Sequence, residues 1–372
     1  MKSLLLLQWK SLRACLPDTQ KLIRLAREHG FLKRVKGLRE MEVWLRLLLM
    51  HTGCGFTLEE TVLLARKFRL ARISPVALHK RLCKAGGWLD AITRHLLAGL
   101  GASKAHPCDS LLERLYAVDA TVLKQLASKG TDWRLHYCVK LSTLRCEHLE
   151  LTDKRGAEGI ARFETKPGQV VLVDRGYCRR AEAAHVLEAG AHFIMRFAPN
   201  NFPLLDKNGR RLDVLAWLRT LRGRRGSECT AYFEHQGKRR KVRLCALRMD
   251  KRGAAKALRR VKRKSQKNGT VGRAQTREMS GYVMVLTTLE KRECTAAQVL
   301  NIYRWRWQVE LVFKSLKSLL GMGNVPKRNA KSARAWIQGK IITALMVEHA
   351  MKKSGTFSPW GQGSQGESVE AL

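Results

Sequence analysis

Three acidic residues stand out in this chain because acids are scarce: its 372 residues include 71 Lys and Arg but only 31 Asp and Glu. Asp119 lies within the predicted strand YAVDATV, on the face of Leu115 and Ala117, since alternate residues of a strand share a face. Asp174 ends the apolar run QVVLVD, which is typical of a strand covered on both faces. A carboxylate that leaves a buried strand is costly unless it is hydrogen-bonded or bound to a cation. A turn-forming aspartate is the alternative for either residue alone, but two on neighbouring predicted strands favour a shared cation.

The third acid, Glu310, lies in the basic stretch YRWRWQVELVFKSLKSLLG, residues 303–321, which has the periodicity of an amphipathic helix. At about 100° per residue, a single helix places four polar residues in a stripe about 60° wide and about 20 Å long: Tyr303, Arg306, Glu310 and Lys317. The opposite side carries apolar residues for packing: Trp305, Val309, Val312, Leu316 and Leu319. A surface ion pair between Arg306 and Glu310 is the alternative, but it leaves Tyr303 and Lys317 without a role.

The chemistry that fits these residues is metal-assisted phosphodiester cleavage. Such cleavage commonly uses two divalent cations about 3.5–4 Å apart, and Mg²⁺ prefers oxygen ligands. Asp119, Asp174 and Glu310 would supply three carboxylates for Mg²⁺ or Mn²⁺. Arg306 and Lys317 would hold non-reacting phosphates, and Tyr303 would stack or donate a hydrogen bond at a DNA end.

Composition points to the same class of partner. The net charge of +40 and the isoelectric point near 10.5 favour a polyanion, most often DNA or RNA. An acidic membrane surface is the rival, but no apolar run reaches the roughly 18 residues of a spanning helix. The opening MKSLLLLQWK has only four consecutive leucines, too few for a secretory signal, so a soluble, cytoplasmic protein is expected. The ten cysteines include no C-x-x-C pair, which argues against zinc fingers and a disulfide framework.

Residues 1–105 are predicted to be all-helical. Thr57 and Glu60 have the spacing of a capping box, and Ser74-Pro75 offers a second helix start. Two short helices joined by a tight turn resemble a helix-turn-helix, whose second helix carries His79, Lys80 and Arg81. An ordinary basic helix pair is the alternative, and the pattern alone leaves both open.

From about residue 110 the periodicity changes to three strands, followed by alternating helix and strand, which predicts an α/β fold with a mixed sheet. Residues 199–292 interrupt this rhythm with a predicted hairpin around HQGK and a strand in SGYVMVLTTL. Within them, residues 238–264 hold fourteen Lys or Arg and one acid. Such a run is either a solvated face or, beside a DNA-processing core, a phosphate-binding surface. Helices return over 296–351, and residues 352–372 are predicted to be a flexible tail.

The spacing Y-(2)-R-(3)-E-(6)-K of Tyr303, Arg306, Glu310 and Lys317 matches the YREK signature of bacterial insertion-sequence transposases of the IS-four family. With VDAT around Asp119 and VLVDRGY around Asp174 in the right order, the chain resembles this family over about residues 35–350.

This resemblance implies a ribonuclease-H-like catalytic domain over 110–198 and 296–351, interrupted by a β-rich basic insertion over 199–292. It also implies an all-helical, helix-turn-helix-like DNA-binding domain over 1–105. Asp119, Asp174 and Glu310 would be the catalytic metal ligands, using two Mg²⁺ or Mn²⁺ ions. Family members cut double-stranded DNA at terminal inverted repeats and join the 3′-hydroxyl to target DNA, usually as dimers on paired ends.

By the same resemblance, Tyr303, Arg306 and Lys317 would contact DNA near the cleaved end, and Arg175 would contribute beside Asp174. Some relatives pass through a hairpin and place an insertion-domain Trp against a flipped base. The comparable strand here offers Tyr282, which can stack on any base and is also suited to a core position.

Two alternatives remain. The helical pattern stops near Met351, earlier than in relatives, so a catalytically or assembly-defective copy that only binds DNA is one alternative. A structure-selective nuclease on the same fold is the other.

Overall fold

The computed structural model describes residues 9–33, 40–100, 111–126, 128, 130–222, 225–269 and 273–353. Most of the predicted tail therefore lies outside the described residues, as does the opening leucine run. The described residues form two compact units. Unit 1 draws on the described residues within 1–109, 120–157 and 308–353, and unit 2 draws on the described residues within 111–119 and 158–307.

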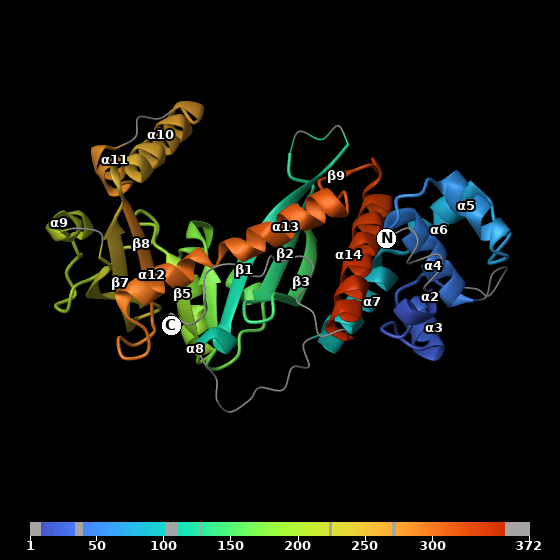
Figure 1. Cartoon of the computed structure of the whole chain (residues 1–372), viewed down its shortest axis with the longest axis horizontal. Helices are drawn as coiled ribbons and strands as arrows, with labels where there is room; N and C mark the ends of the chain where they lie inside the picture. Colours follow the sequence, from blue (N-terminus) through green and yellow to red (C-terminus); the bar gives the residue numbers. More distant parts are fainter. Residues whose placement is uncertain are drawn as a thin grey trace. The chain divides into compact units, whose positions relative to one another are not determined.

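The N-terminal part of unit 1 is helical, as predicted (Figure 1). Its helices are α2 (Trp9–Arg13), α3 (Thr19–Glu28), α4 (Met41–Thr52), α5 (Leu58–Lys67), α6 (Pro75–Leu82) and α7 (Gly86–Leu100). The two predicted helix starts are confirmed. Thr57 and Glu60 form a reciprocal capping box at α5, and the Ser74 hydroxyl accepts from the Ala77 N–H at α6.

A long C-terminal helix, α14 (Ala330–Lys353), packs against α4 and α7 in the core of unit 1. A Cβ added at Gly339 of α14 would lie 2.0 Å from the Thr52 Oγ1 of α4, so the two backbones meet where only glycine fits. Unit 1 also holds the antiparallel hairpin of β2 (Trp133–Lys140) and β3 (Arg145–Asp153). β9 (Asn324–Val325) pairs with Lys124 and Gln125.

Unit 2 is built on a mixed sheet whose strand order is β1-β4-β5-β8-β7-β6. The strands are β1 (Leu115–Gln125, which passes into unit 1 after Asp119), β4 (Val170–Val173), β5 (His192–Arg196), β6 (Ser227–His235), β7 (Lys238–Arg248) and β8 (Tyr282–Thr287). β1, β4 and β5 are parallel, and β8, β7 and β6 extend the sheet in antiparallel fashion. The helices of this unit are α8 (Arg180–Glu188), α9 (Val214–Thr220), α10 (Lys251–Lys267), α11 (Ala274–Met279) and α12 (Ala296–Arg304).

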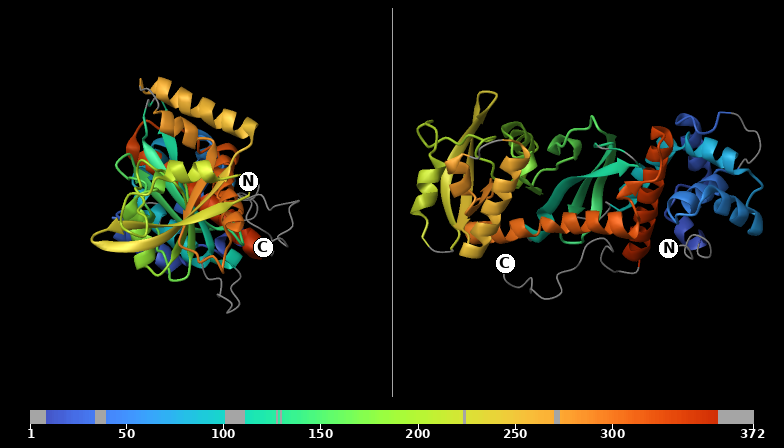
Figure 2. Two further views of the ribbon diagram at one scale, coloured as in Figure 1. Left: turned by 90° about the vertical axis from the view of Figure 1, so that its left-hand side faces the viewer. Right: turned by 90° about the horizontal axis from the view of Figure 1, so that it is seen from above.

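The predicted hairpin around HQGK is confirmed. Gln236 and Gly237 both have positive φ angles, 51° and 70°, as a two-residue type I′ turn requires between β6 and β7. The region 199–292 is not only strands, however, because α10 and α11 form a helical excursion between the ends of β7 and β8 (Figures 1 and 2). The chain is thus a mixed α/β protein with a mixed sheet.

The prediction of one continuous helix over residues 303–321 was wrong. α12 ends at Arg304, and α13 (Trp307–Leu319) starts after a turn at Trp305 and Arg306. In this turn the Trp305 N–H donates to the Ile302 carbonyl and the Arg306 N–H donates to the Tyr303 carbonyl, which tightens the chain to three-residue bonds. The common stripe from Tyr303 to Lys317 therefore does not exist as a single helical face.

Nine of the ten cysteines lie in the described residues, and all nine are free thiols. No helix in the described parts of the chain is long and apolar enough to cross a membrane.

Candidate functional site

The two aspartates lie side by side where β4 ends next to the middle of the parallel strand β1. Ala117 of β1 lies opposite Leu172 of β4, and both are fully buried. Continuing this register by two residues places Asp119 opposite Asp174, which directly follows the end of β4. Residues in register on neighbouring strands lie about 4.8 Å apart and project to the same face. The two negatively charged carboxylates therefore repel each other, and a positive group close by is needed to stabilise them.

Arg306 supplies positive charge to the first aspartate. Its Nη1 donates to the Asp119 Oδ2 at 3.2 Å, and the two side chains are only 11% and 21% exposed. The guanidinium carbon also lies 5.9 Å from the centroid of the Tyr303 ring. Because the pair is shielded from water, its attraction exceeds that of an ordinary surface ion pair.

Tyr303 serves the second aspartate. Its hydroxyl donates to the Asp174 Oδ1 at 3.0 Å. Burial opposes ionisation of Asp174, but the backbone N–H of Arg175, the charge of Arg306 and the Tyr303 hydroxyl outweigh it, so the pKa of the carboxyl lies below its ordinary value. Burial and the nearby carboxylate raise the pKa of Tyr303, which keeps its hydroxyl a donor. Asp174 precedes a short helical turn, but its side chain makes no capping hydrogen bond there, which argues against a purely turn-forming role.

Arg196 belongs to this cluster and was missed in the sequence. β4 and β5 are parallel with Val173 opposite Met195, so the next residues, Asp174 and Arg196, are also in register. The charge of Arg196 contributes to the lowered pKa of Asp174. The available signal was positional: Arg196 ends the buried strand AHFIMR much as Asp174 follows QVVLV.

The remaining two signature residues lie on α13, in unit 1. Glu310 is exposed in the first turn of α13. Lys317, seven residues on, shares its face because seven residues make nearly two helical turns. Partial burial lowers the pKa of Lys317. Val309, Val312 and Leu316 are buried as expected, whereas Leu319 is 67% exposed.

Of the three residues expected to read DNA on α6, Lys80 is exposed and His79 is half-buried beside Cys83. Arg81 turns inward. Its Nη1 donates to the Phe31 carbonyl at 2.9 Å, and its guanidinium lies over the rings of Phe31 and Trp44.

In unit 2, the expected DNA-contacting residues Arg175 and Tyr282 occupy accessible positions. Arg175 is exposed in the turn after Asp174. Tyr282 is half-exposed at the start of β8, opposite Arg248.

The aspartate pair suits a hard divalent cation in donor chemistry, because carboxylate oxygens on adjacent strands can reach one ion together. Within the described ranges, no three His, Cys, Asp or Glu side chains are grouped closely enough to hold a metal ion. The structure thus provides two in-register carboxylates, already supplied with positive charge and hydrogen-bond donors.

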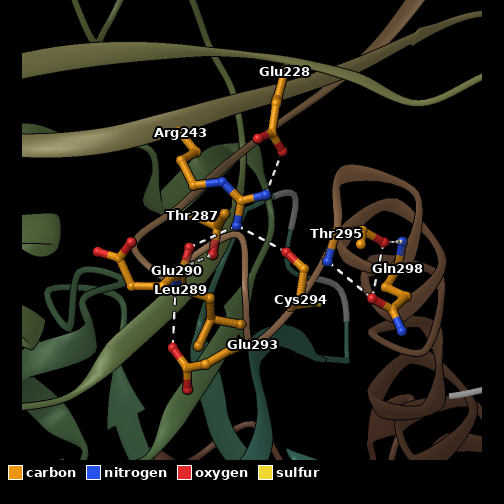
Figure 3. A network of polar contacts seen from close by, with 9 residues as sticks. All are labelled: Glu228, Arg243, Thr287, Leu289, Glu290, Glu293, Cys294, Thr295 and Gln298. Carbon is orange, nitrogen blue, oxygen red and sulfur yellow. Dashed lines mark hydrogen bonds and ion pairs between the residues drawn. The ribbon is translucent and has the colours of Figure 1, made fainter.

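A buried network fixes the loop that leads into α12 and so to Tyr303 (Figure 3). The Arg243 Nη1 on β7 donates to the carbonyls of Leu289 at 2.7 Å and Cys294 at 2.9 Å, while its Nη2 pairs with Glu228. At the end of this loop, Thr295 and Gln298 form a capping box that starts α12. Arg243 of β7 therefore holds the loop that precedes the helix carrying Tyr303.

Comparison with known proteins agrees with this geometry. Residues 111–346 match the model of the transposase DDE domain family. The transposase for insertion sequence element IS421 of Escherichia coli is 31% identical over 364 residues, covering 96% of this chain and 97% of that protein. InsL of element IS186A from Escherichia coli K12, also named as a transposase, is 31% identical over 363 residues with the same shares covered. A more distant relative, the transposase for IS231E of Bacillus thuringiensis subsp. finitimus, is 24% identical over 217 residues, 53% of this chain and 44% of its own. With its in-register aspartates, its Tyr and Arg partners and these matches, the chain belongs to the DDE transposase family.

Proposed function

We propose that the protein is a DNA transposase that binds the terminal inverted repeats of an insertion sequence, cleaves there and transfers the freed strand to target DNA. The observation that carries this function is the in-register pair Asp119 and Asp174, each held by a residue of the YREK signature. DDE enzymes depend on divalent metal, and we propose Mg²⁺ or Mn²⁺ with two ions per site. When bound, such ions would activate the attacking oxygen and stabilise the leaving one.

Each signature residue has a proposed task. Asp119, Asp174 and Glu310 are the metal ligands. Arg306 and Lys317 bind non-reacting phosphates near the cleaved end, with Arg175 beside them, and Tyr303 positions Asp174 and meets the DNA end. Support comes from the contacts of Tyr303 and Arg306 with the aspartates and from the family's spacing around Glu310 and Lys317.

Arg306 is suited to two anionic partners. In this structure its guanidinium neutralises Asp119. The same group is well suited to a phosphate oxygen near the cleaved end, which it can bind through two donors.

The wider organisation is also a proposal. Residues 1–105 would form a helical DNA-binding domain, in which His79 and Lys80 approach DNA while Arg81 supports the fold of its surroundings. Residues 110–198 and 296–351 would form the ribonuclease-H-like catalytic domain, and 199–292 its insertion, with Tyr282 stacking on a base. The protein would act as a homodimer on paired ends, in the cytoplasm at the nucleoid.

The decisive experiment incubates purified protein with DNA carrying the gene's own flanking termini, in Mg²⁺ or Mn²⁺ and in chelator. Wild type is compared with Asp119→Asn, Asp174→Asn and Glu310→Gln. The matched control is Glu164→Gln, which alters an exposed acid outside the cluster. We expect metal-dependent cuts at the repeat boundary by wild type and control only, with end binding retained by all.

Retained cleavage in one carboxylate variant would remove that residue from the metal site. Binding by the wild type without any cut would replace the proposed function with that of a DNA-binding copy. Cuts that ignore the repeat boundary would indicate a structure-selective nuclease instead.

A further inference from the structure

Helix α10 is the most strongly charged element of unit 2. Nine of its seventeen residues are Lys or Arg, none is acidic, and all nine cations are exposed. They are Lys251, Arg252, Lys256, Arg259, Arg260, Lys262, Arg263, Lys264 and Lys267. The helix stands beyond the ends of β7 and β8, next to α11 (Figure 2). The basic run identified in the sequence is therefore divided between strand β7 and the solvent-exposed helix α10.

The cations of α10 form a line. At about 100° per residue, six of them fall within an arc of about 100°, and the line from Arg252 to Lys267 is about 22 Å long. Successive positions Arg252, Lys256, Arg259 and Arg263 are three or four residues apart, which puts a charge about every 4.5–6 Å along the helix axis. A duplex carries one phosphate per roughly 3.4 Å of axis on each strand. A straight row of cations at this density therefore suits a phosphate backbone better than a single anion.

No acid nearby neutralises this row. The segment from Asp250 to Gly281 contains only two acids, Asp250 and Glu278. Asp250 caps α10 by accepting from the Gly253 N–H at 2.6 Å. Glu278 is held by both Arg219 Nε and Nη2 at 2.8 Å. Among the described residues, none of the nine cations of α10 forms an ion pair, so their charge faces outward uncompensated.

The other side of α10 excludes a membrane as the intended partner. Its apolar stripe is narrow and contains Ala254, Ala257, Leu258 and Val261, all of them half-buried. A membrane-surface helix needs large exposed side chains such as Trp, Phe and Leu on that side. Here the apolar side chains are half-buried, and Ala254 lies near Gly281, the residue before β8, so this side of the helix faces the protein.

Resting on the proposed function, we infer that α10 lies along the phosphate backbone of duplex DNA and binds it without regard to sequence. Lys and Arg aimed at phosphates add affinity and orientation, whereas sequence is read at base edges. α10 therefore raises affinity equally for the element's ends and for unrelated DNA. It is a sequence-independent DNA-binding surface, distinct from the proposed cleavage site at Asp119 and Asp174.

The test compares two variants of the full chain with equal loss of charge. The first carries Lys256→Gln, Arg259→Gln, Arg260→Gln and Arg263→Gln, since Gln keeps helix propensity. The control carries Lys207→Gln, Arg210→Gln, Arg211→Gln and Arg222→Gln, four exposed cations elsewhere in unit 2. Circular dichroism verifies folding of both.

Binding is measured against salt concentration on a duplex carrying the element's end and on an unrelated duplex. Each lost phosphate contact lowers the salt slope by about 0.9. The α10 variant should therefore lose about 2–4 from the slope and about two to four orders of magnitude in affinity at 0.1 M salt, equally on both duplexes. The control should lose less than 1 from the slope.

Equal losses in the two variants, or an unchanged slope in the α10 variant, would overturn the inference. So would a loss confined to the element's end, or α10-dependent binding to phosphatidylserine vesicles without any change on DNA. Cleavage is followed in the same samples. A wild type that never cuts but shows the α10-dependent slope disproves the transposase function alone, whereas one that cuts with an α10-independent slope disproves this inference alone.

Discussion

Replacing Arg243 by Met tests whether the buried network before α12 is a main support of unit 2. Arg243 is only 7% exposed, and it serves two loop carbonyls and Glu228 (Figure 3). Met fills similar space but offers no donor. Each carbonyl left buried without a partner costs about 1–3 kcal/mol. Glu228 is 22% exposed, so water can take the place of Arg243 beside it, and the loss of this ion pair adds less to the cost.

One contribution acts in the opposite direction. The Nε of Arg243 has no acceptor among the described residues, so removing the guanidinium relieves about 1 kcal/mol of unsatisfied burial. We therefore expect Arg243→Met to cost about 3–4 kcal/mol in all. Arg243→Lys, which keeps the charge but has a single donor group, should cost about half as much.

Hydrogen exchange of the β7 and β8 amides measures this change directly, because it reports the free energy of opening of that sheet without assuming that both units unfold together. Val242, Leu244 and Val285 are suitable reporters, all buried in the paired strands. A loss below about 1 kcal/mol in Arg243→Met, with Glu228→Gln equally silent, would refute the view that the loop carbonyls depend on Arg243.

Three further outcomes are expected. Gly339→Ala should destabilise unit 1 by at least about 2 kcal/mol in urea unfolding, because its Cβ would collide with Thr52. Burial, followed by the charge of Lys327, lowers the pKa of His51 to about 4. As the pH falls, His51 therefore takes up a proton in the unfolded chain before it does so in the folded protein. Lowering the pH from 7 to 5 should reduce the free energy of unfolding of the wild type by about 2 kcal/mol, and this loss should be absent in His51→Gln. Arg306→Ala should weaken end binding and lower its salt slope by about 1, since one phosphate contact disappears.

Matched controls separate these effects from general damage. Gly130 has open space where a Cβ would lie, so Gly130→Ala should leave stability within about 0.5 kcal/mol. If Gly339→Ala is equally mild, the close approach of α4 and α14 is not obligatory. A pH dependence that survives in His51→Gln would assign the lost stability to another group. A salt slope unchanged in both Arg306→Ala and Lys317→Ala would count against phosphate contact by the signature.

Local features of this fold were predictable because they depend on neighbours in the sequence. The capping boxes, the hairpin turn and the buried strands follow from side chains within a few positions of one another. Asp119 and Asp174 were identified because a carboxylate within or directly after a buried strand needs a partner. Their exact opposition required the register of β1 and β4, which no local pattern specifies.

The break between α12 and α13 could not be seen in the periodicity, because Trp305 and Arg306 are compatible with a helix. Their turn coincides with the contact of Arg306 with Asp119, residues 187 positions apart in the chain. Arg81 illustrates the same limit. Its inward hydrogen bond to Phe31 depends on packing between helices, whereas its sequence neighbours only mark it as basic. Long-range contacts of this kind decide which charges remain available to DNA.

The partnership of α14 with the N-terminal helices also sets the time course of folding during synthesis. Lys340 of α14 donates to the carbonyl of Gly53, 287 residues earlier in the chain. At a translation rate of about 5–20 residues per second, α14 emerges from the ribosome about 15–60 s after α4. Throughout that interval Thr52, fully buried in the finished protein, lacks the close approach of Gly339 of α14. Unit 1 can therefore be completed only after α14 has been made, although α4, with which α14 packs, is made long before it.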